Sequence, residues 1–162
     1  MWNNTHIHAS VLCKEHRAIH MLVHDPTNQK NLIVSRVYGP TRNREKDHFW
    51  ANLAQLNDVI DNPWCIVGDF NKLEMQAKKK GGNLVSARRT ERLSSFLSFI
   101  QGESILIKGQ PFTWKRRVND SWIYKRLDRG IARFDFARLY PNLCTSHGSF
   151  TFSDHCPIIV ST

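Results

Sequence analysis

The sequence lacks both paired cysteines and long apolar runs. Its four cysteines, Cys13, Cys65, Cys144 and Cys156, are widely separated and form no CxxC pair, so neither a zinc knuckle nor a disulfide framework is supported. No segment reaches the roughly 20 consecutive apolar residues of a transmembrane helix, and the N-terminus MWNNTH does not resemble a signal peptide. These absences predict an intracellular protein, in the nucleus or the cytoplasm, that is neither secreted nor membrane-bound.

Acidic residues are also scarce. Asp and Glu number 14 against 23 Lys and Arg, which leaves a net charge of +9. This balance favours a polyanionic partner, because each phosphate that a basic side chain neutralises releases counterions. A length of 162 residues with 41% hydrophobic residues is typical of one globular domain with a core. Nucleic acid is therefore the expected partner.

One basic stretch is interleaved with aromatic residues, namely Trp114, Trp122 and Tyr124. Rings and cations in this arrangement can stack on bases and neutralise phosphates. Alternating aromatic residues in a strand also occur in protein cores, which is the alternative. The candidate nucleic-acid-binding residues of this stretch are Lys115, Arg116, Arg117, Lys125 and Arg126.

Hydrophobic periodicity predicts short strands mixed with helices at irregular spacing. This pattern indicates an α/β fold with largely antiparallel sheets rather than a doubly wound parallel sheet. Strands are predicted at 5–12, 18–24, 31–38, 64–67, 104–107, 112–117, 121–126, 147–152 and 157–161. Helices are predicted between Asn43 and Pro63, over about 86–101 with Gly102 as the stop, and at 134–139.

The segment Gly68-Asp69-Phe70-Asn71 directly follows the apolar strand at 64–67. Alternation along a strand would send the side chains of Asp69 and Asn71 to the same side, at a strand end where sites are often built. A carboxylate there can hold a metal or accept a proton from water, and an amide can donate to a phosphate oxygen. The same residues are common in turns, and spacing alone favours that alternative.

A second candidate is Asp154-His155, which lies between two apolar segments. A carboxylate can orient a histidine and keep it charged, which suits a pentavalent phosphate transition state. A structural hydrogen-bonded pair is an equal alternative. Asp128, in the segment Arg126-Leu127-Asp128-Arg129, offers a third carboxylate, for which a local ion pair is the alternative.

Seven segments occur in one order along the chain, namely VYGP (37–40), the helix with Phe49-Trp50, PWCIVGDFN (63–71), KGG (80–82), PFTW (111–114), KRLDR (125–129) and SDHCPI (153–158). Together they resemble the endonuclease/exonuclease/phosphatase superfamily, which has the DNase I-like fold. They are most similar to endonuclease domains of plant non-LTR retrotransposons, and their joint occurrence is specific. The resemblance extends from about residue 18 to 162 and implies a single partial domain over 1–162, in which two mainly antiparallel β-sheets flanked by helices form a four-layer sandwich. In an intact element a reverse transcriptase domain would follow.

The resemblance implies roles for the matching residues of the first half of the site. Asp69 resembles the residue that orients or deprotonates the attacking water. Asn71 resembles a donor to the scissile phosphate. Tyr38 matches a tyrosine whose hydroxyl contacts that phosphate.

The other matching residues follow later in the chain. Asp154 resembles a carboxylate on the metal side of the site and is the one candidate metal ligand. His155 resembles the histidine that stabilises the developing charge, and Asp128 the aspartate that orients it. Family members hydrolyse phosphodiesters with Mg²⁺ or Mn²⁺, so one of these ions is the expected cofactor and DNA the expected substrate.

The resemblance is incomplete at its beginning. Family domains begin with an asparagine-bearing strand and then a strand that ends in a metal-binding glutamate, and the sequence matches neither. Glu15 is the sole acid before Asp25, and its setting differs, so the glutamate stays unassigned. We therefore expect a truncated, retrotransposon-derived nuclease domain with weak or no activity. The alternatives are a non-catalytic nucleic-acid-binding remnant and, least favoured by the positive charge, a lipid or inositol phosphatase.

Overall fold

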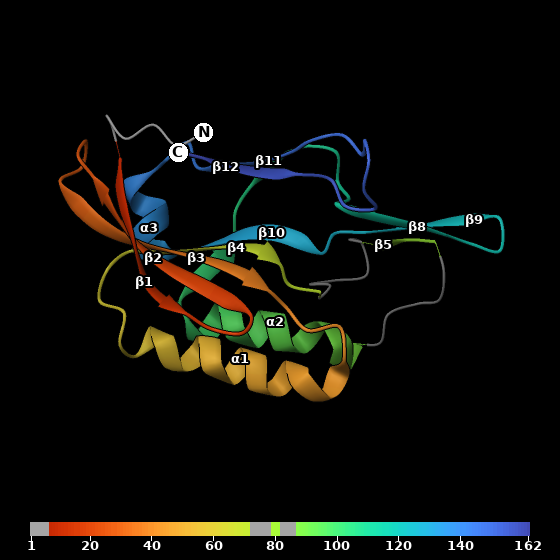
Figure 1. Cartoon of the computed structure of the whole chain (residues 1–162), viewed down its shortest axis with the longest axis horizontal. Coiled ribbons are helices and arrows are strands. Elements are labelled where there is room, and N and C mark those ends of the chain that lie inside the picture. Colours follow the sequence, from red (N-terminus) through yellow and green to blue (C-terminus); the bar gives the residue numbers. More distant parts are fainter. Residues whose placement is uncertain (1–6, 72–78, 82–86) are drawn as a thin grey trace.

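A computed structural model describes residues 7–71, 79–81 and 87–162 as sheets with helices packed against them (Figure 1). Among these residues, no helix is both long and apolar enough to cross a membrane. The helices of the described part are α1 (Asn43–Asn57), α2 (Ala87–Phe99) and α3 (Phe134–Leu139).

The largest sheet has six strands in the order β1-β2-β3-β4-β10-β6. Strands β3 and β4 are parallel, and the other neighbours are antiparallel, as the predicted mainly antiparallel fold requires. Its strands are β1 (His8–Lys14), β2 (Ala18–Asp25), β3 (Lys30–Tyr38), β4 (Trp64–Asp69), β10 (Asp128–Arg133) and β6 (Gly102–Ser104).

Helices α1 and α2 lie side by side and cover one face of this sheet (Figure 1). The apolar stripe of α1, with Phe49 and Leu53, packs with Trp64 and Ile66 of β4 in one buried cluster. Phe70, just after β4, stacks on Trp50 with ring centroids 5.8 Å apart. Burying these large side chains anchors the chain at the end of β4, next to Asp69.

A smaller sheet lies on the opposite face of the large sheet. Its strand order is β12-β11-β7. In the cluster between the two sheets, Cys65 and Ala132 of the large sheet pack with Val160 of β12 and with Ile105. Helix α3 packs at one side, where Phe136 joins the same cluster. The strands are β7 (Ile107–Gly109), β11 (Cys144–His147) and β12 (Ile158–Ser161).

A third sheet extends away from the other two (Figure 1). It is built on the hairpin of β8 (Trp114–Val118) and β9 (Ser121–Lys125), to which β5 (Lys79–Lys80) adds as a third strand. The strands predicted at 112–117 and 121–126 are this hairpin.

The strand predicted at 104–107 was wrong. The chain forms two short strands there, β6 and β7, which belong to different sheets. Ile105 sits between them and is only 5% exposed, because the chain crosses from one sheet to the other at that point. Gly102 does not stop α2 either. It opens β6, where a Cβ atom would come within 2.8 Å of the Ala132 carbonyl, so this glycine permits close strand pairing.

The strand predicted at 147–152 was also wrong, because β11 ends at His147 and residues 149–152 form no strand. The Gly148 amide instead donates to the Pro157 carbonyl, which turns the chain back towards β12. Strand β10 was missed entirely. Its central residues Gly130 and Ala132 are small, so the segment lacks the alternation of bulky apolar residues that marks a strand.

The hydroxyl of Ser35 on β3 connects two other buried polar side chains of the large sheet, His20 on β2 and Trp64 on β4. It accepts a hydrogen bond from the Trp64 indole at 2.8 Å and pairs with His20 Nδ1 at 2.7 Å. Ser35→Ala is expected to cost about 1–3 kcal/mol of unfolding free energy, because it leaves buried polar groups without partners. Urea denaturation measures this loss against Ser10→Ala on the exposed strand β1, and equal values for the two variants would contradict it.

Candidate active site

Three of the candidate residues form a row across neighbouring strands. Tyr38 at the end of β3 is the register partner of Asp69 at the end of β4. Asp69 is in turn the register partner of Asp128 at the start of β10. Register partners point their side chains to the same face of a sheet, and Cys65 and Ala132, which share that face along β4 and β10, contact the smaller sheet. The row therefore lies on the face opposite α1 and α2.

Asn71 and Asp69 are held together by a tight turn rather than by strand alternation. Strand β4 ends at Asp69, and Asn71 adopts a left-handed conformation with φ of 48°. The Asn71 backbone N–H donates to Asp69 Oδ1 at 2.7 Å, and its side-chain amide donates to Asp69 Oδ2 at 2.9 Å. The same amide donates to the Gly39 carbonyl at 2.8 Å. Both oxygens of Asp69 are therefore fixed in position.

The protonation of Asp69 is shifted by its surroundings. Burial raises the pKa of Asp69 to about 6 from its usual 3.8, and the nearby Asp128 carboxylate adds to the rise. The hydrogen bond from the Asn71 backbone and the charge of His155 act in the opposite direction but do not cancel it. A carboxylate with this pKa is ionised at neutral pH and can accept a proton more readily than an exposed aspartate.

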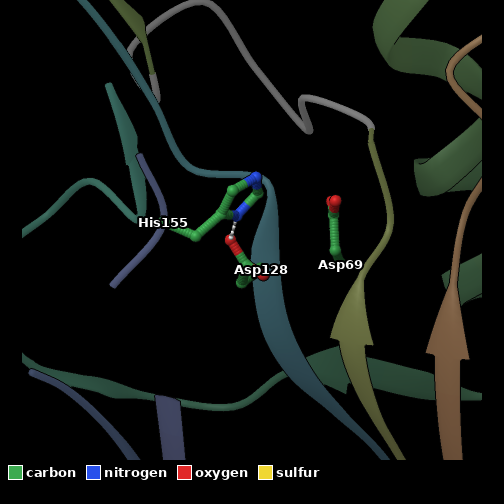
Figure 2. A group of neighbouring side chains, drawn as sticks. All are labelled: Asp69, Asp128 and His155. Carbon is green, nitrogen blue, oxygen red and sulfur yellow. Dashed lines mark hydrogen bonds and ion pairs between the residues drawn. The ribbon is translucent and has the colours of Figure 1, made fainter. Parts of the chain in front are cut away.

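His155 faces Asp128 and Asp69 (Figure 2). Its Nδ1 pairs with Asp128 Oδ2 at 2.8 Å. This hydrogen bond raises the pKa of His155, burial opposes the rise, and the Asp69 and Asp154 carboxylates add to it. One ligand-type atom from each of Asp69, Asp128 and His155 lies within 4.8 Å of the others, so the structure brings these three residues together.

Asp154 lies outside that group of three. Its Oδ2 accepts a hydrogen bond from the Trp114 indole at 2.9 Å, and its backbone carbonyl accepts one from the Lys115 amide at 2.9 Å. The side chain of Asp154 is exposed at the foot of the β8–β9 hairpin. Tyr38 is likewise 53% exposed, and so its ring is available at the open end of the row.

Comparison with solved structures gives the fold. No family model matches the sequence, and no curated protein matches it either. The endonuclease domain of TRAS1, a telomere-specific non-LTR retrotransposon, aligns with 95% of this chain at a TM-score of 0.73 and 12% identity. The AP endonuclease LMAP from Leishmania major aligns with 91% at a TM-score of 0.71 and 14% identity. The 3′ phosphatase NExo from Neisseria aligns with 97% at a TM-score of 0.68 and 14% identity.

The chain has the DNase I-like fold. Its structural neighbours include proteins of the endonuclease/exonuclease/phosphatase superfamily, one of them the endonuclease of a non-LTR retrotransposon. The chain spans 68%, 55% and 70% of the lengths of the three structures named above. The DNase I-like fold predicted from the sequence is thereby confirmed.

In this DNase I-like fold the basic candidates follow the β8–β9 hairpin. Lys115 Nζ lies 4.7 Å from the Phe150 ring centroid and 5.4 Å from that of Trp122, and Lys125 Nζ lies 4.7 Å from that of Trp114. Trp114 and Trp122 thus carry lysines on their faces, whereas Tyr124 packs against Phe112 and Trp122 with ring centroids 5.8 and 6.2 Å apart. Arg116 and Arg117 are also on β8, and Arg126, directly after β9, donates to the Pro111 carbonyl at 2.8 Å.

Two residues that support the candidate site were missed in the sequence. Thr113 is fully buried, and its hydroxyl accepts hydrogen bonds from the Leu127 and Asp128 amides at 2.9 and 3.0 Å, which fixes the start of β10. Lys46 of α1 donates to the Asn71 carbonyl at 3.0 Å. Both contacts join residues far apart in the chain, and no local pattern marks them.

Proposed function

We propose that this chain is a phosphodiester hydrolase domain of the endonuclease type, derived from a retrotransposon of the plant branch and directed at DNA. The observation that carries the proposal is the row formed by Tyr38, Asp69 and the Asp128–His155 pair, which lies beside a basic hairpin. Two proteins of similar structure are named as endonucleases, which supports the same chemistry here.

In the proposed reaction Asp69 orients and deprotonates the attacking water, for which a pKa raised to about 6 suits it. The hydrogen bond with Asp128 favours the protonated form of His155, which stabilises the charge that develops on the phosphate. The Tyr38 hydroxyl contacts the same phosphate. Asn71 first fixes Asp69, because its side-chain amide already donates to Asp69 and to the Gly39 carbonyl, and it reaches the phosphate only by giving up one of these bonds.

The expected cofactor is Mg²⁺ or Mn²⁺, which prefers carboxylate oxygens and retained waters. The donor set fits it only in part. Both Asp69 oxygens accept hydrogen bonds from Asn71, and Asp128 Oδ2 is engaged with His155. Asp154 is the residue proposed to hold the ion, and the glutamate that the resemblance would place beside it is left unassigned. When bound, the ion would polarise a phosphate oxygen.

We also propose that the domain is truncated and that further strands complete its smaller sheet in the intact form. Within the described residues β12 pairs only with β11. Beside it lies a cavity of about 680 Å³ whose lining includes Val23, Val34, Val67 and Val160. An unpaired edge next to an apolar hollow is where an added strand would be stabilised.

A plasmid assay tests the activity. Supercoiled DNA with Mg²⁺ or Mn²⁺ is expected to be nicked weakly or not at all, since the metal ligand set is incomplete. Asp69→Ala and His155→Ala are the site variants, and Asp61→Ala, at an exposed position away from the hairpin, is the control. Strong nicking that both site variants abolish and the control keeps would refute the claim of weak activity and establish the nuclease.

The second candidate, a non-catalytic nucleic-acid-binding remnant, is favoured by the basic hairpin. If its five cationic residues contact phosphates, DNA affinity in EDTA should fall with salt at a log–log slope of about −4.5. Arg116→Ala with Arg117→Ala should reduce that slope by about 2, because each lost contact removes close to 0.9. Lys14→Ala with Lys30→Ala, on β1 and β3, is the matched control. Equal slopes for both double variants would exclude the hairpin as the binding surface.

A further inference from the structure

The start of β8 is joined to the segment that carries His155. Trp114 and His155 form an antiparallel β-bridge. On either side of it, the Lys115 amide donates to the Asp154 carbonyl and the Cys156 amide donates to the Thr113 carbonyl, both at 2.9 Å. The hairpin and the loop with Asp154 and His155 are therefore one hydrogen-bonded unit, although they lie about 40 positions apart in the chain.

The side chain of Trp114 adds a second connection. Its indole N–H donates to Asp154 Oδ2 at 2.9 Å, while Lys125 lies over its ring at 4.7 Å. A cation above an indole attracts the ring electrons and makes its N–H a stronger donor. The charge of Lys125 thus strengthens the hold of Trp114 on the Asp154 carboxylate.

A hollow of about 440 Å³ lies along this connection. Its lining includes Trp114, Arg116, Arg117 and Asp154, so cations of the hairpin and the carboxylate of the loop face the same space. A phosphate entering the hollow would approach the hairpin cations and be repelled by Asp154, unless that carboxylate is held aside or binds a cation. The position of Asp154 thus decides what the hollow accepts.

We propose that Trp114 is a positioning residue that couples the β8–β9 hairpin to the loop of Asp154 and His155. A nucleic-acid phosphate bound on the hairpin draws Lys125 away from the indole, weakens the Trp114–Asp154 hydrogen bond and so changes the setting of the His155 loop. The inference rests on the proposed function in one respect, namely that the hairpin binds nucleic acid.

The hydrogen bond is tested without DNA or metal. In ¹⁵N-labelled protein the Trp114 indole signal is identified by its loss in Trp114→Phe, a change that keeps a ring beneath Lys125. Asp154→Asn is expected to speed hydrogen exchange of that indole at least about 3-fold, because a bond to a charged acceptor is roughly twice as strong as a neutral one. An unchanged exchange rate would overturn the role of Trp114.

The coupling is tested by titrating a short DNA duplex in EDTA and following the backbone amide of His155. In the wild type the NMR signal of this amide should shift as DNA is added, until the protein is saturated with DNA. In Trp114→Phe the shift should fall to less than half, while DNA binds with equal or higher affinity, because the variant has no Trp114–Asp154 hydrogen bond for DNA to weaken. Trp122→Phe is the matched control, because Trp122 also carries a lysine but has no bond to Asp154, and it should keep the His155 response.

The outcomes separate the two claims. Equal His155 shifts in the wild type and in Trp114→Phe would overturn the coupling while leaving DNA binding intact. Absence of DNA binding by the wild type would overturn the proposed partner and the coupling with it. In that case the indole exchange measurement still decides whether Trp114 positions Asp154.

Discussion

Asp69→Asn is expected to make the protein more stable at pH 8 by about 1–3 kcal/mol. Burial raises the pKa of Asp69 from 3.8 to about 6, so the folded protein holds this proton more tightly than the unfolded chain does. The contribution of Asp69 to stability is therefore greatest below about pH 4 and is lost as the pH rises through about 4 to 6. Asparagine does not ionise, so the variant avoids the cost of a buried charge. It also loses one acceptor for the Asn71 amide, and the gain in stability is therefore smaller than the pKa shift alone would give.

Urea denaturation at pH 4 and pH 8 measures this effect. At pH 4 the variant should be no more stable than the wild type, because Asp69 is already protonated in the folded state. Asp120→Asn, at a 93% exposed side chain, provides the control and should show no gain at pH 8. An equal difference between Asp69→Asn and wild type at both pH values would show that burial of the charge is not the cause.

Gly68→Ala is expected to cost about 3 kcal/mol or more of unfolding free energy, the range of severe backbone conflicts. Gly68 has a φ of +147°, and a Cβ atom there would lie 2.0 Å from the Val37 carbonyl oxygen. That carbonyl belongs to β3, the parallel neighbour of β4, and cannot move without disturbing the pairing that places Tyr38 beside Asp69.

Gly109→Ala is the matched control for this variant. Gly109 also has a positive φ, +95°, but a Cβ there would be 3.1 Å from the nearest atom, so its cost should stay near the 1 kcal/mol of an ordinary left-handed alanine. Thermal or urea denaturation of both variants separates the cost of the steric contact with Val37 from the cost of placing an alanine at a positive φ. Similar losses would show that the contact with Val37 has no special weight.

The sequence predicted the elements that have strong local patterns. The apolar stripe of Phe49 and Leu53 located α1, and the short apolar run before Gly68 located β4. Helix α3 has the predicted bounds, Phe134–Leu139. These elements are recognisable because the period of their apolar residues matches the face they bury.

The arrangement of the site could not be read from local patterns. The Asp69–Asp128 register joins two strands far apart in the chain, and the turn at Asn71 depends on a left-handed residue that is not glycine. It was the resemblance, not periodicity, that paired Asp128 with His155. The Trp114–Asp154 hydrogen bond was not foreseen, because indole N–H donors show no sequence signature and the strand predicted at 147–152 placed the preceding segment wrongly.

The pairing of Asp128 with Asp69 across β10 and β4 has an evolutionary and an engineering consequence. The β8–β9 hairpin lies between these two strands in the chain and is a separate excursion, closed by its own strand pairing independently of the Asp128–Asp69 pairing. The entropy of closing such an excursion changes by only about 0.6 kcal/mol when its length doubles. Residues can therefore be inserted at the exposed tip of the hairpin, around Asn119 and Asp120, without altering the spacing of the two carboxylates. The tip of the hairpin can thus be replaced by other loops. Its length and sequence can differ between related proteins while the distance between the Asp69 and Asp128 carboxylates stays constant.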